Sequence, residues 1–162
     1  MEKMETSILY NYPFVAMVSA MVLAQALKLI SYGWRERRFD YGFMFRLGGM
    51  PSSHSASAGA ATTAIGLVAG FHSPVFALAI GMLFLIALDA QGVRHAAGQQ
   101  AKLLNQMAEE FYRDRKVQPK RLVEFLGHTR WEVLVGLLLG IAVALAFWYA
   151  FPGWAQRWAQ VF

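Results

Sequence analysis

The sequence predicts an all-α protein, a polytopic bundle of about four membrane-spanning helices. Hydrophobic residues make up 57% of the 162 residues and charged residues only 15%, which is too apolar for an ordinary soluble domain of this length. The mean hydropathy is +0.37, and the apolar residues gather in runs that approach the roughly 20 residues needed to cross a bilayer. We therefore expect residues 1–162 to form a single integral membrane domain.

Four hydrophobic runs are the candidate spans. The first, residues 12–30, lacks a basic leader and a small-residue cleavage site, so we expect a retained anchor. The second, residues 55–70, is rich in Ala, Gly, Ser and Thr, which let membrane helices approach closely, and is expected inside the bundle. The third, residues 74–88, is short and ends at Asp89. The fourth, residues 133–151, is the strongest hydrophobic run.

The basic residues predict the orientation of the bundle. Four crossings would place the connections after the first and third spans on one side, with 13 of the 15 Lys and Arg residues. By the positive-inside rule, these connections are expected in the cytoplasm and both termini outside. A re-entrant second or third span would change this assignment. The residues on the cytoplasmic side are Lys28, Arg35, Arg37, Arg38, Arg46, Arg94, Lys102, Arg113, Arg115, Lys116, Lys120, Arg121 and Arg130, and those opposite are Lys3 and Arg157.

An amphipathic helix is predicted in the second cytoplasmic connection. Ala97, Ala101, Leu104, Ala108 and Phe111 recur at spacings of three and four residues, opposite Gln, Lys and Glu. This face would lie along the membrane surface or pack on the bundle. The polar side mixes both charge signs, so the pattern leaves the two alternatives open.

The composition excludes several functions. The chain has no cysteine, so disulfides, thiolate nucleophiles and thiolate metal sites are absent. With four histidines, a metal site has little support, and we expect neither a metal nor a cofactor. The net charge of +5 does not indicate a nucleic-acid partner, because the basic residues lack the interleaved aromatics of a base-stacking surface.

The polar stretch LGGMPSSHSA opens the second hydrophobic run. Pro51 is expected in the first turn of that helix, where its fixed φ is favourable, and Ser52, Ser53 and His54 follow. Backbone amides, hydroxyls and the positive end of the helix dipole would form a cradle for an anion such as phosphate. A capped helix start with a surface histidine explains the same residues.

A second polar stretch, GHTRWE, precedes the fourth run. Thr129 and Glu132 have the spacing of a capping box, which explains both residues without catalysis. The box does not explain His128, which is expected on the same side of the membrane as His54. Two histidines, one accepting phosphate and one protonating the leaving group, would suffice for covalent phosphoryl transfer.

Three stretches together, GGMPSSHSA, DAQGVRHAAGQQAKLLNQ and LGHTRWEVLVG, resemble the divergent bacterial and plant branch of the type 2 phosphatidic acid phosphatase and vanadium haloperoxidase superfamily. The resemblance covers residues 25–140. It implies that His128 is the nucleophile, oriented by Glu132, and that His54 is the general acid. The phosphate ligands that it implies are Lys28, Arg35, Ser52 and Ser53.

The sequence departs from the superfamily pattern at several positions. The parent motifs have Gly, Pro and Asp where this chain has Ser53, Glu36 and Glu132. The Ser-Arg pair before the nucleophile is missing, and the nearest arginine, Arg121, is one place too early. Arg94 would supply that charge, although an ion pair between Asp89 and Arg94 is an alternative. Loss of one anion ligand would cost about 2.7 to 4 kcal/mol of transition-state stabilisation.

Three functions remain in view. The leading hypothesis is a membrane-embedded hydrolase, related to acid phosphatases, that acts on a phosphomonoester or diphosphate, in particular a lipid-linked one, through a phosphohistidine. The second is a non-enzymatic binder or carrier of a phosphorylated lipid with the same anion site. The third is a structural bundle that assembles with other membrane proteins, and a homo-oligomer also stays open. Haloperoxidase activity is disfavoured because nothing marks a halide site. The expected location is a bacterial plasma (inner) membrane.

Overall fold

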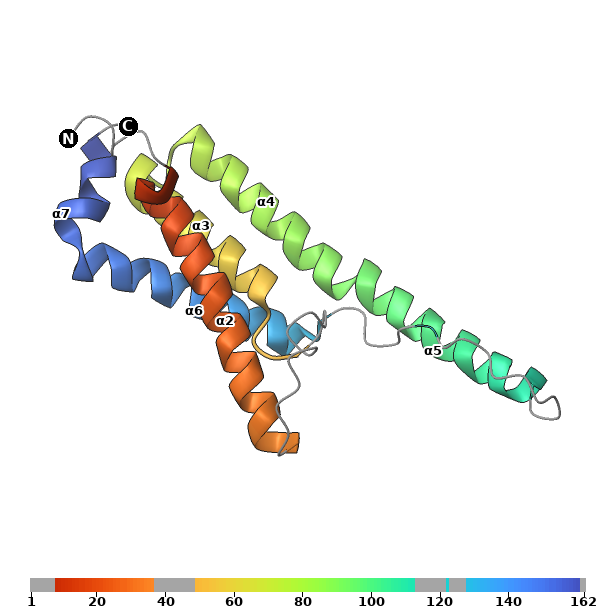
Figure 1. Cartoon of the computed structure of the whole chain (residues 1–162). Helices are drawn as coiled ribbons and strands as arrows, with labels where there is room; N and C mark the ends of the chain where they lie inside the picture. Colours follow the sequence, from red (N-terminus) through yellow and green to blue (C-terminus); the bar gives the residue numbers. More distant parts are fainter. Residues whose placement is uncertain (1–7, 37–48, 113–121, 123–127, 161–162) are drawn as a thin grey trace.

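The structure is a computed structural model that describes residues 8–36, 49–112, 122 and 128–160. Within these ranges the chain consists of helices and their connections (Figure 1). The elements are η1 (Ile8–Tyr10), α2 (Tyr12–Glu36), α3 (Ser53–Ala69), α4 (Pro74–Gln91), α5 (Val93–Tyr112), α6 (Arg130–Ala150), α7 (Pro152–Ala155) and η3 (Gln156–Gln160). The all-α prediction is confirmed for the described residues.

All four predicted hydrophobic runs form helices, with shifted ends. Helix α2 continues to Glu36, α3 begins at Ser53, and α4 ends at Gln91. Two helical stretches, Tyr12–Gly33 and Arg130–Ala150, are long and apolar enough to cross a membrane, and the apolar part of α4 is shorter. The number of crossings therefore stays a prediction. The amphipathic helix expected in the second long connection forms as α5.

Helix α3 is the centre of the bundle, and it packs against α2, α6 and α4. In each of the three helices α2, α3 and α6, the buried residues recur every four positions and so lie in a row on one face. Most of these residues are Ala or Gly, which let the helices approach closely. These rows are Tyr12, Ala16, Ala20, Ala24 and Lys28 on α2, Ala56, Ala60, Ala64 and Val68 on α3, and Gly136, Gly140 and Ala144 on α6. The prediction that the small-residue helix lies inside the bundle is confirmed.

Glycines decide how closely α3 and α6 approach. A Cβ atom at Gly136 would collide with the carbonyl oxygen of Ser52, and one at Gly140 with that of Ala56. A Cβ atom at Gly59 would lie 2.8 Å from the Cδ1 atom of Leu137. The contact therefore depends on glycine in both helices, as in other small-residue membrane crossings.

Aromatic side chains close the end of the core where α2 begins and α6 ends. The Tyr12 hydroxyl donates a hydrogen bond to the Ala144 carbonyl at 2.8 Å. The indole N–H groups of Trp154 and Trp158 donate to the Tyr10 carbonyl at 2.9 and 3.1 Å. These bonds tie the N-terminal helices to the C-terminal ones, which lie together in Figure 1.

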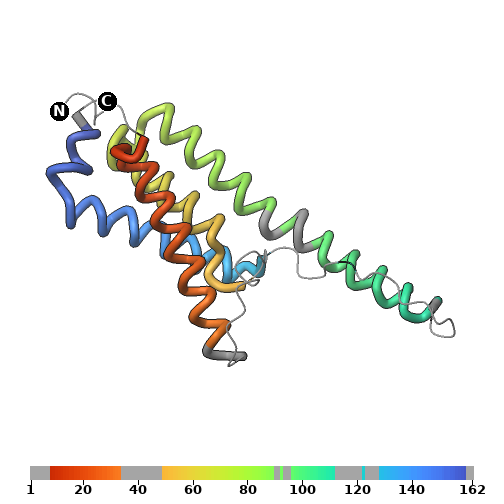
Figure 2. The backbone as a smooth tube through the Cα atoms, in the orientation of Figure 1, coloured from red at the N-terminus to blue at the C-terminus, as the bar shows by residue number. Residues whose placement is uncertain are grey.

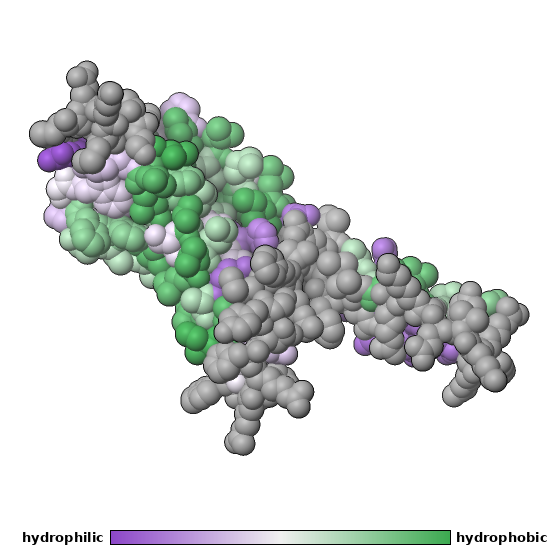
Figure 3. Space-filling model, in the orientation of Figure 1, coloured by the Kyte–Doolittle hydropathy of each residue, from purple (hydrophilic) through white to green (hydrophobic). Residues whose placement is uncertain are grey.

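Helices α4 and α5 form a long arm (Figure 2). A turn at residues 70–73 reverses the chain after α3, and the Thr62 hydroxyl donates to the Ala79 carbonyl at 3.3 Å. Helix α5 follows at Gly92 and extends beyond the three-helix core. The visible surface is hydrophobic over α2 and α4 (Figure 3), as expected for helices that face lipid.

Candidate functional site

The candidate site lies where α3 and α6 begin and α2 approaches its end. Helices α3 and α6 start beside each other because the Ser52 amide donates to the Glu132 carbonyl at 3.0 Å. This bond joins the two polar stretches that were singled out in the sequence. The site is therefore assembled from segments far apart in the chain.

Ser52 is the N-cap of α3 and is completely buried. Its hydroxyl oxygen accepts hydrogen bonds from the Ser55 amide at 3.3 Å and from the Ser55 hydroxyl at 3.1 Å. Pro51 was expected inside the first helical turn, and that prediction is wrong: Pro51 precedes the cap. A serine cap is preferred here because its side chain satisfies an amide at the helix start, which proline cannot do.

The two histidines meet across the start of α3. The ring centroids of His54 and His128 lie 6.1 Å apart, with the planes inclined by 74°. His54 is exposed, whereas His128 is only 3% exposed. One ring can thus exchange protons with solvent while the other is held in the protein. Ser53, between the cap and His54, is also buried at 5% exposure.

Lys28 brings a buried positive charge to the same end of the bundle. It is the last of the five residues in the buried row on α2 and is 3% exposed. A Cβ atom at Gly49, where φ is +97°, would lie 3.5 Å from the Cγ and Cδ atoms of Lys28. The backbone before α3 therefore lies against the lysine stem. The Glu132 carboxylate acts electrostatically on the ammonium group.

Glu132 also caps α6. Its Oε2 atom accepts a hydrogen bond from the Thr129 amide at 2.8 Å, and its own amide donates to the Thr129 hydroxyl oxygen at 3.3 Å. The predicted capping box is confirmed. This carboxylate therefore fixes the first turn of α6, directly after His128, while acting on Lys28 from another helix.

Two of the expected phosphate ligands have no described side chain. Arg35 lies in the last turn of α2, and Arg94 lies near the start of α5. Their side chains lie outside the described part of the structure, as does a pair between Asp89 and Arg94. Within the described ranges, no group of three His, Cys, Asp or Glu side chains could hold a metal ion.

The sequence analysis missed the residues that hold this site together. Gly136 lets the Ser52 carbonyl lie against α6, and Ser55 fixes the Ser52 side chain. The signal was present as GLLLG, residues 136–140, a Gly-x-x-x-Gly pattern typical of close helix pairs. Gly49 gave no such signal, because its partner Lys28 is distant in sequence.

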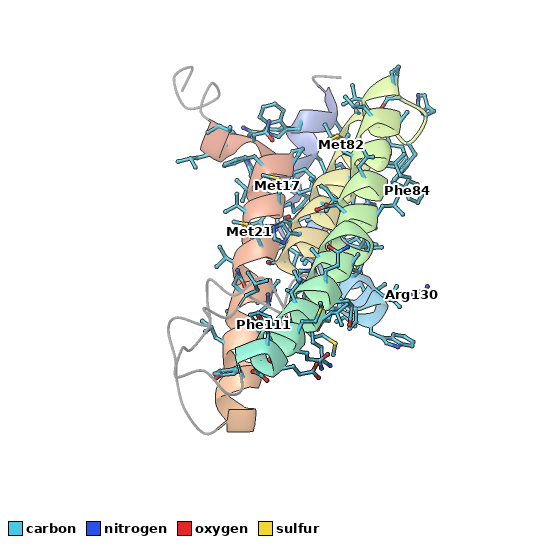
Figure 4. All side chains as sticks on the ribbon, turned by 90° about the vertical axis from the view of Figure 1, so that its right-hand side faces the viewer. Met17, Met21, Met82, Phe84, Phe111 and Arg130 are labelled. Carbon is cyan, nitrogen blue, oxygen red and sulfur yellow. The ribbon has the colours of Figure 1, made fainter. Side chains whose placement is uncertain are left out.

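An apolar groove begins one helical turn from His54. The groove has a volume of about 320 Å³ and lies between α2, α3 and α4. The Ser57 hydroxyl, at the polar end of the groove, donates to the His54 carbonyl at 2.9 Å. Figure 4 shows Met17 of α2 and Met82 of α4, which line the groove on its two sides.

Comparisons with known proteins identify the family of the chain. Residues 9–143 match the family described as the Divergent PAP2 family. The chain is 34% identical over 155 residues to the Bacillus subtilis (strain 168) protein named "Uncharacterized membrane protein YuiD", a match that covers 89% of this chain and 98% of the relative. No solved structure matches the chain. The family match extends over most of the sequence and includes both histidines, and the chain belongs to the Divergent PAP2 family.

Proposed function

We propose that the protein is an integral membrane phosphatase that removes a phosphate group from a phosphorylated lipid. The observation that carries this proposal is the approach of His54 and His128 at the start of α3. The buried Lys28 of α2 lies against the backbone at Gly49, just before that helix start. Family membership supports the proposal further. Two imidazoles at this separation can act on the same phosphoryl group.

The reaction would proceed in two steps. A ring nitrogen of His128 attacks phosphorus, the bond to the ester or diphosphate oxygen breaks, and His54 gives its proton to the leaving oxygen. Water then attacks the phosphohistidine, His54 takes a proton from that water, and inorganic phosphate leaves with His128 restored. His54 acts first as the acid and then as the base, and both rings end the cycle in their starting states.

Positive groups would stabilise the charge on the phosphoryl oxygens. Lys28 supplies an ammonium group from α2, and the first amides of α3, beginning with Ser53, supply the positive end of a helix dipole. Arg35 and Arg94 are the further cations that we propose for this role. Such preorganised groups are the main means by which proteins accelerate phosphoryl transfer.

The apolar groove supports the proposal of a lipid substrate. The groove reaches Ser57, one turn from His54, and its other lining residues are almost all apolar. We propose that it holds part of the hydrocarbon chain while the phosphate lies at the histidine pair. The four predicted crossings and the 13 basic residues on one side favour a site that opens toward the cytoplasm.

A non-enzymatic carrier of phosphorylated lipids is the second candidate, and Glu132 is the observation that favours it. The carboxylate caps α6 and acts on Lys28. These two roles explain the presence of the Glu132 carboxylate even if it does not orient a nucleophile. A carrier would use the same anion site and the same groove, and it would release its ligand unchanged.

Phosphate release separates the two functions. We would offer soluble and lipid phosphomonoesters and diphosphates to the detergent-purified protein and measure inorganic phosphate. His128→Asn is expected to abolish release, and His54→Gln to lower it by roughly 10² to 10⁴-fold. His72→Gln is the control, because His72 is exposed at the other end of α3. A folded protein that binds vanadate but releases no phosphate from any substrate would contradict the phosphatase and support the carrier.

A further inference from the structure

Helix α5 carries a set of exposed apolar side chains on one side. Leu103, Leu104, Met107 and Phe111 are 52–67% exposed. With 3.6 residues per turn, these four side chains fall within an arc of about 100° on one side of the helix. We name this surface, formed by these four residues, the apolar arc. An apolar arc of this width is typical of a helix that contacts a membrane or another protein surface.

The remaining surface of α5 is polar or already in use. Lys102, Gln106 and Glu109 are exposed on the side away from the apolar arc, whereas Gln99 and Glu110 flank its Leu103 edge and Gln100 falls within it. The buried Asn105 donates from its amide nitrogen to the Leu122 carbonyl at 2.9 Å and accepts from the Leu122 amide at 2.9 Å. These two bonds hold the Leu122 backbone on the side of α5 opposite the apolar arc.

The position of α5 indicates what covers the apolar arc. Helices α3 and α4 are antiparallel, so α5 leaves the bundle at the end that carries His54 and His128. It begins where the apolar part of α4, Pro74–Asp89, has just ended. A helix that starts at this level is within reach of the lipid headgroups if α4 crosses the bilayer.

The sequence that follows α5 favours an anionic lipid surface over a second copy of the chain. Between positions 113 and 121 the sequence RDRKVQPKR carries five basic residues and one acidic residue. Basic sequence next to an amphipathic helix is attracted to anionic headgroups, whereas two copies would bring like charges together.

We infer that α5 is an interfacial helix whose apolar arc inserts into the headgroup boundary of the membrane that contains α2 and α6. In the structure α5 continues roughly in the direction of α4 (Figure 1). The two helices are separate and meet at Gly92, so a bend there would bring α5 onto the surface. The inference rests on the membrane insertion put forward under the proposed function and not on phosphatase chemistry.

Single cysteines can test this directly, because the natural chain has none. We would introduce Met107→Cys on the apolar arc and Gln106→Cys on the polar side, label each with a polarity-sensitive fluorophore, and reconstitute the full chain into vesicles of mixed phosphatidylcholine and phosphatidylglycerol. Both positions are exposed, so neither change should disturb the fold.

The label at position 107 is expected to shift to shorter wavelength and to lose about half of its emission or more with lipids brominated near the headgroup. The label at position 106 is expected to show neither effect. Equal exposure of both labels to water would overturn the inference. The inference would also be overturned if the label at position 107 were shielded from water but not quenched by brominated lipid, and if this shielding disappeared when the protein was diluted in lipid. A second copy of the chain would then cover the apolar arc.

Discussion

The two ends of the α2–α3–α6 core use the same helix packing to hold opposite kinds of side chain. The buried row on α2 begins with Tyr12 and ends with Lys28. At the tyrosine end, the hydroxyl is bonded to the Ala144 carbonyl of α6. At the lysine end, the side-chain stem lies against the backbone at Gly49, and the ammonium group interacts electrostatically with Glu132. Small residues between the two ends bring both within reach of α6.

The polar groups at the two ends differ in their partners. At the aromatic end, the donors of Tyr12, Trp154 and Trp158 all bond to backbone carbonyls of the bundle, as buried tyrosine and tryptophan side chains usually do. At the other end, a cation, a carboxylate and two imidazoles converge on the start of one helix. Two of these groups, Lys28 and His128, are buried, and burial of such groups costs free energy unless partners offset it.

The largest expected effect is at Gly140, in the middle of the core. Gly140→Leu would force a Cβ atom into the Ala56 carbonyl, and overpacking at backbone commonly costs about 1 to 3 kcal/mol or more. We expect the packing at both ends of the core to be lost together, which would appear as a lower unfolding temperature in detergent and a reduced yield. Gly81→Leu is the matched control, because nothing lies within 4 Å of a Cβ atom there. Equal stability of the two variants would show that the core does not depend on this contact.

The next effect concerns the lysine end alone. Lys28→Met keeps the length of the side chain and removes its charge, so we expect vanadate or phosphate binding to weaken by about tenfold or more, the value of a lost charge-assisted contact. Unfolding should change less than binding, because the desolvation cost of the buried ammonium group is removed together with its attraction to Glu132. Lys102→Met on the exposed side of α5 should leave binding intact. Unchanged affinity in Lys28→Met would exclude this lysine from the anion site.

The reverse pattern is expected at the tyrosine end. Tyr12→Phe removes the hydrogen bond to the Ala144 carbonyl and should lower stability by about 1 to 1.5 kcal/mol, the upper part of the range for one hydrogen bond, because the carbonyl keeps its partner within α6. Anion binding per folded molecule should not change. Denaturant titration followed by tryptophan fluorescence, alongside a vanadate-binding assay, measures both quantities. A variant that lost anion binding at full stability would break the proposed division between the ends.

The smallest expected effect is at the C-terminal helices. Trp154→Phe removes one of two indole donors to the Tyr10 carbonyl, and Trp158 still donates. We expect a loss of about 0.5 to 1.5 kcal/mol, within the range of a single hydrogen bond whose acceptor stays satisfied. The double change Trp154→Phe with Trp158→Phe should cost more than the sum of the single changes, because only then is the Tyr10 carbonyl left bare. Simple additivity would mean that the two indoles act independently.

Local sequence patterns determined much of this protein. The hydrophobic runs gave the helices, and the capping box of Thr129 and Glu132 formed as predicted, because both depend on residues three or four positions apart. The two histidine stretches were recognised as candidate parts of one site. The end of α2 and the position of Pro51 were not predicted correctly, since helix ends respond to neighbours from other segments.

Tertiary structure decided how these parts meet. Only folding brings the Ser52 amide to the Glu132 carbonyl, His54 to His128, and Gly49 to Lys28. It also decided that His128 is buried while His54 is exposed. The physical reason is that a helix pattern defines which face is small or polar, whereas the partner of that face depends on backbone approach between residues far apart in sequence.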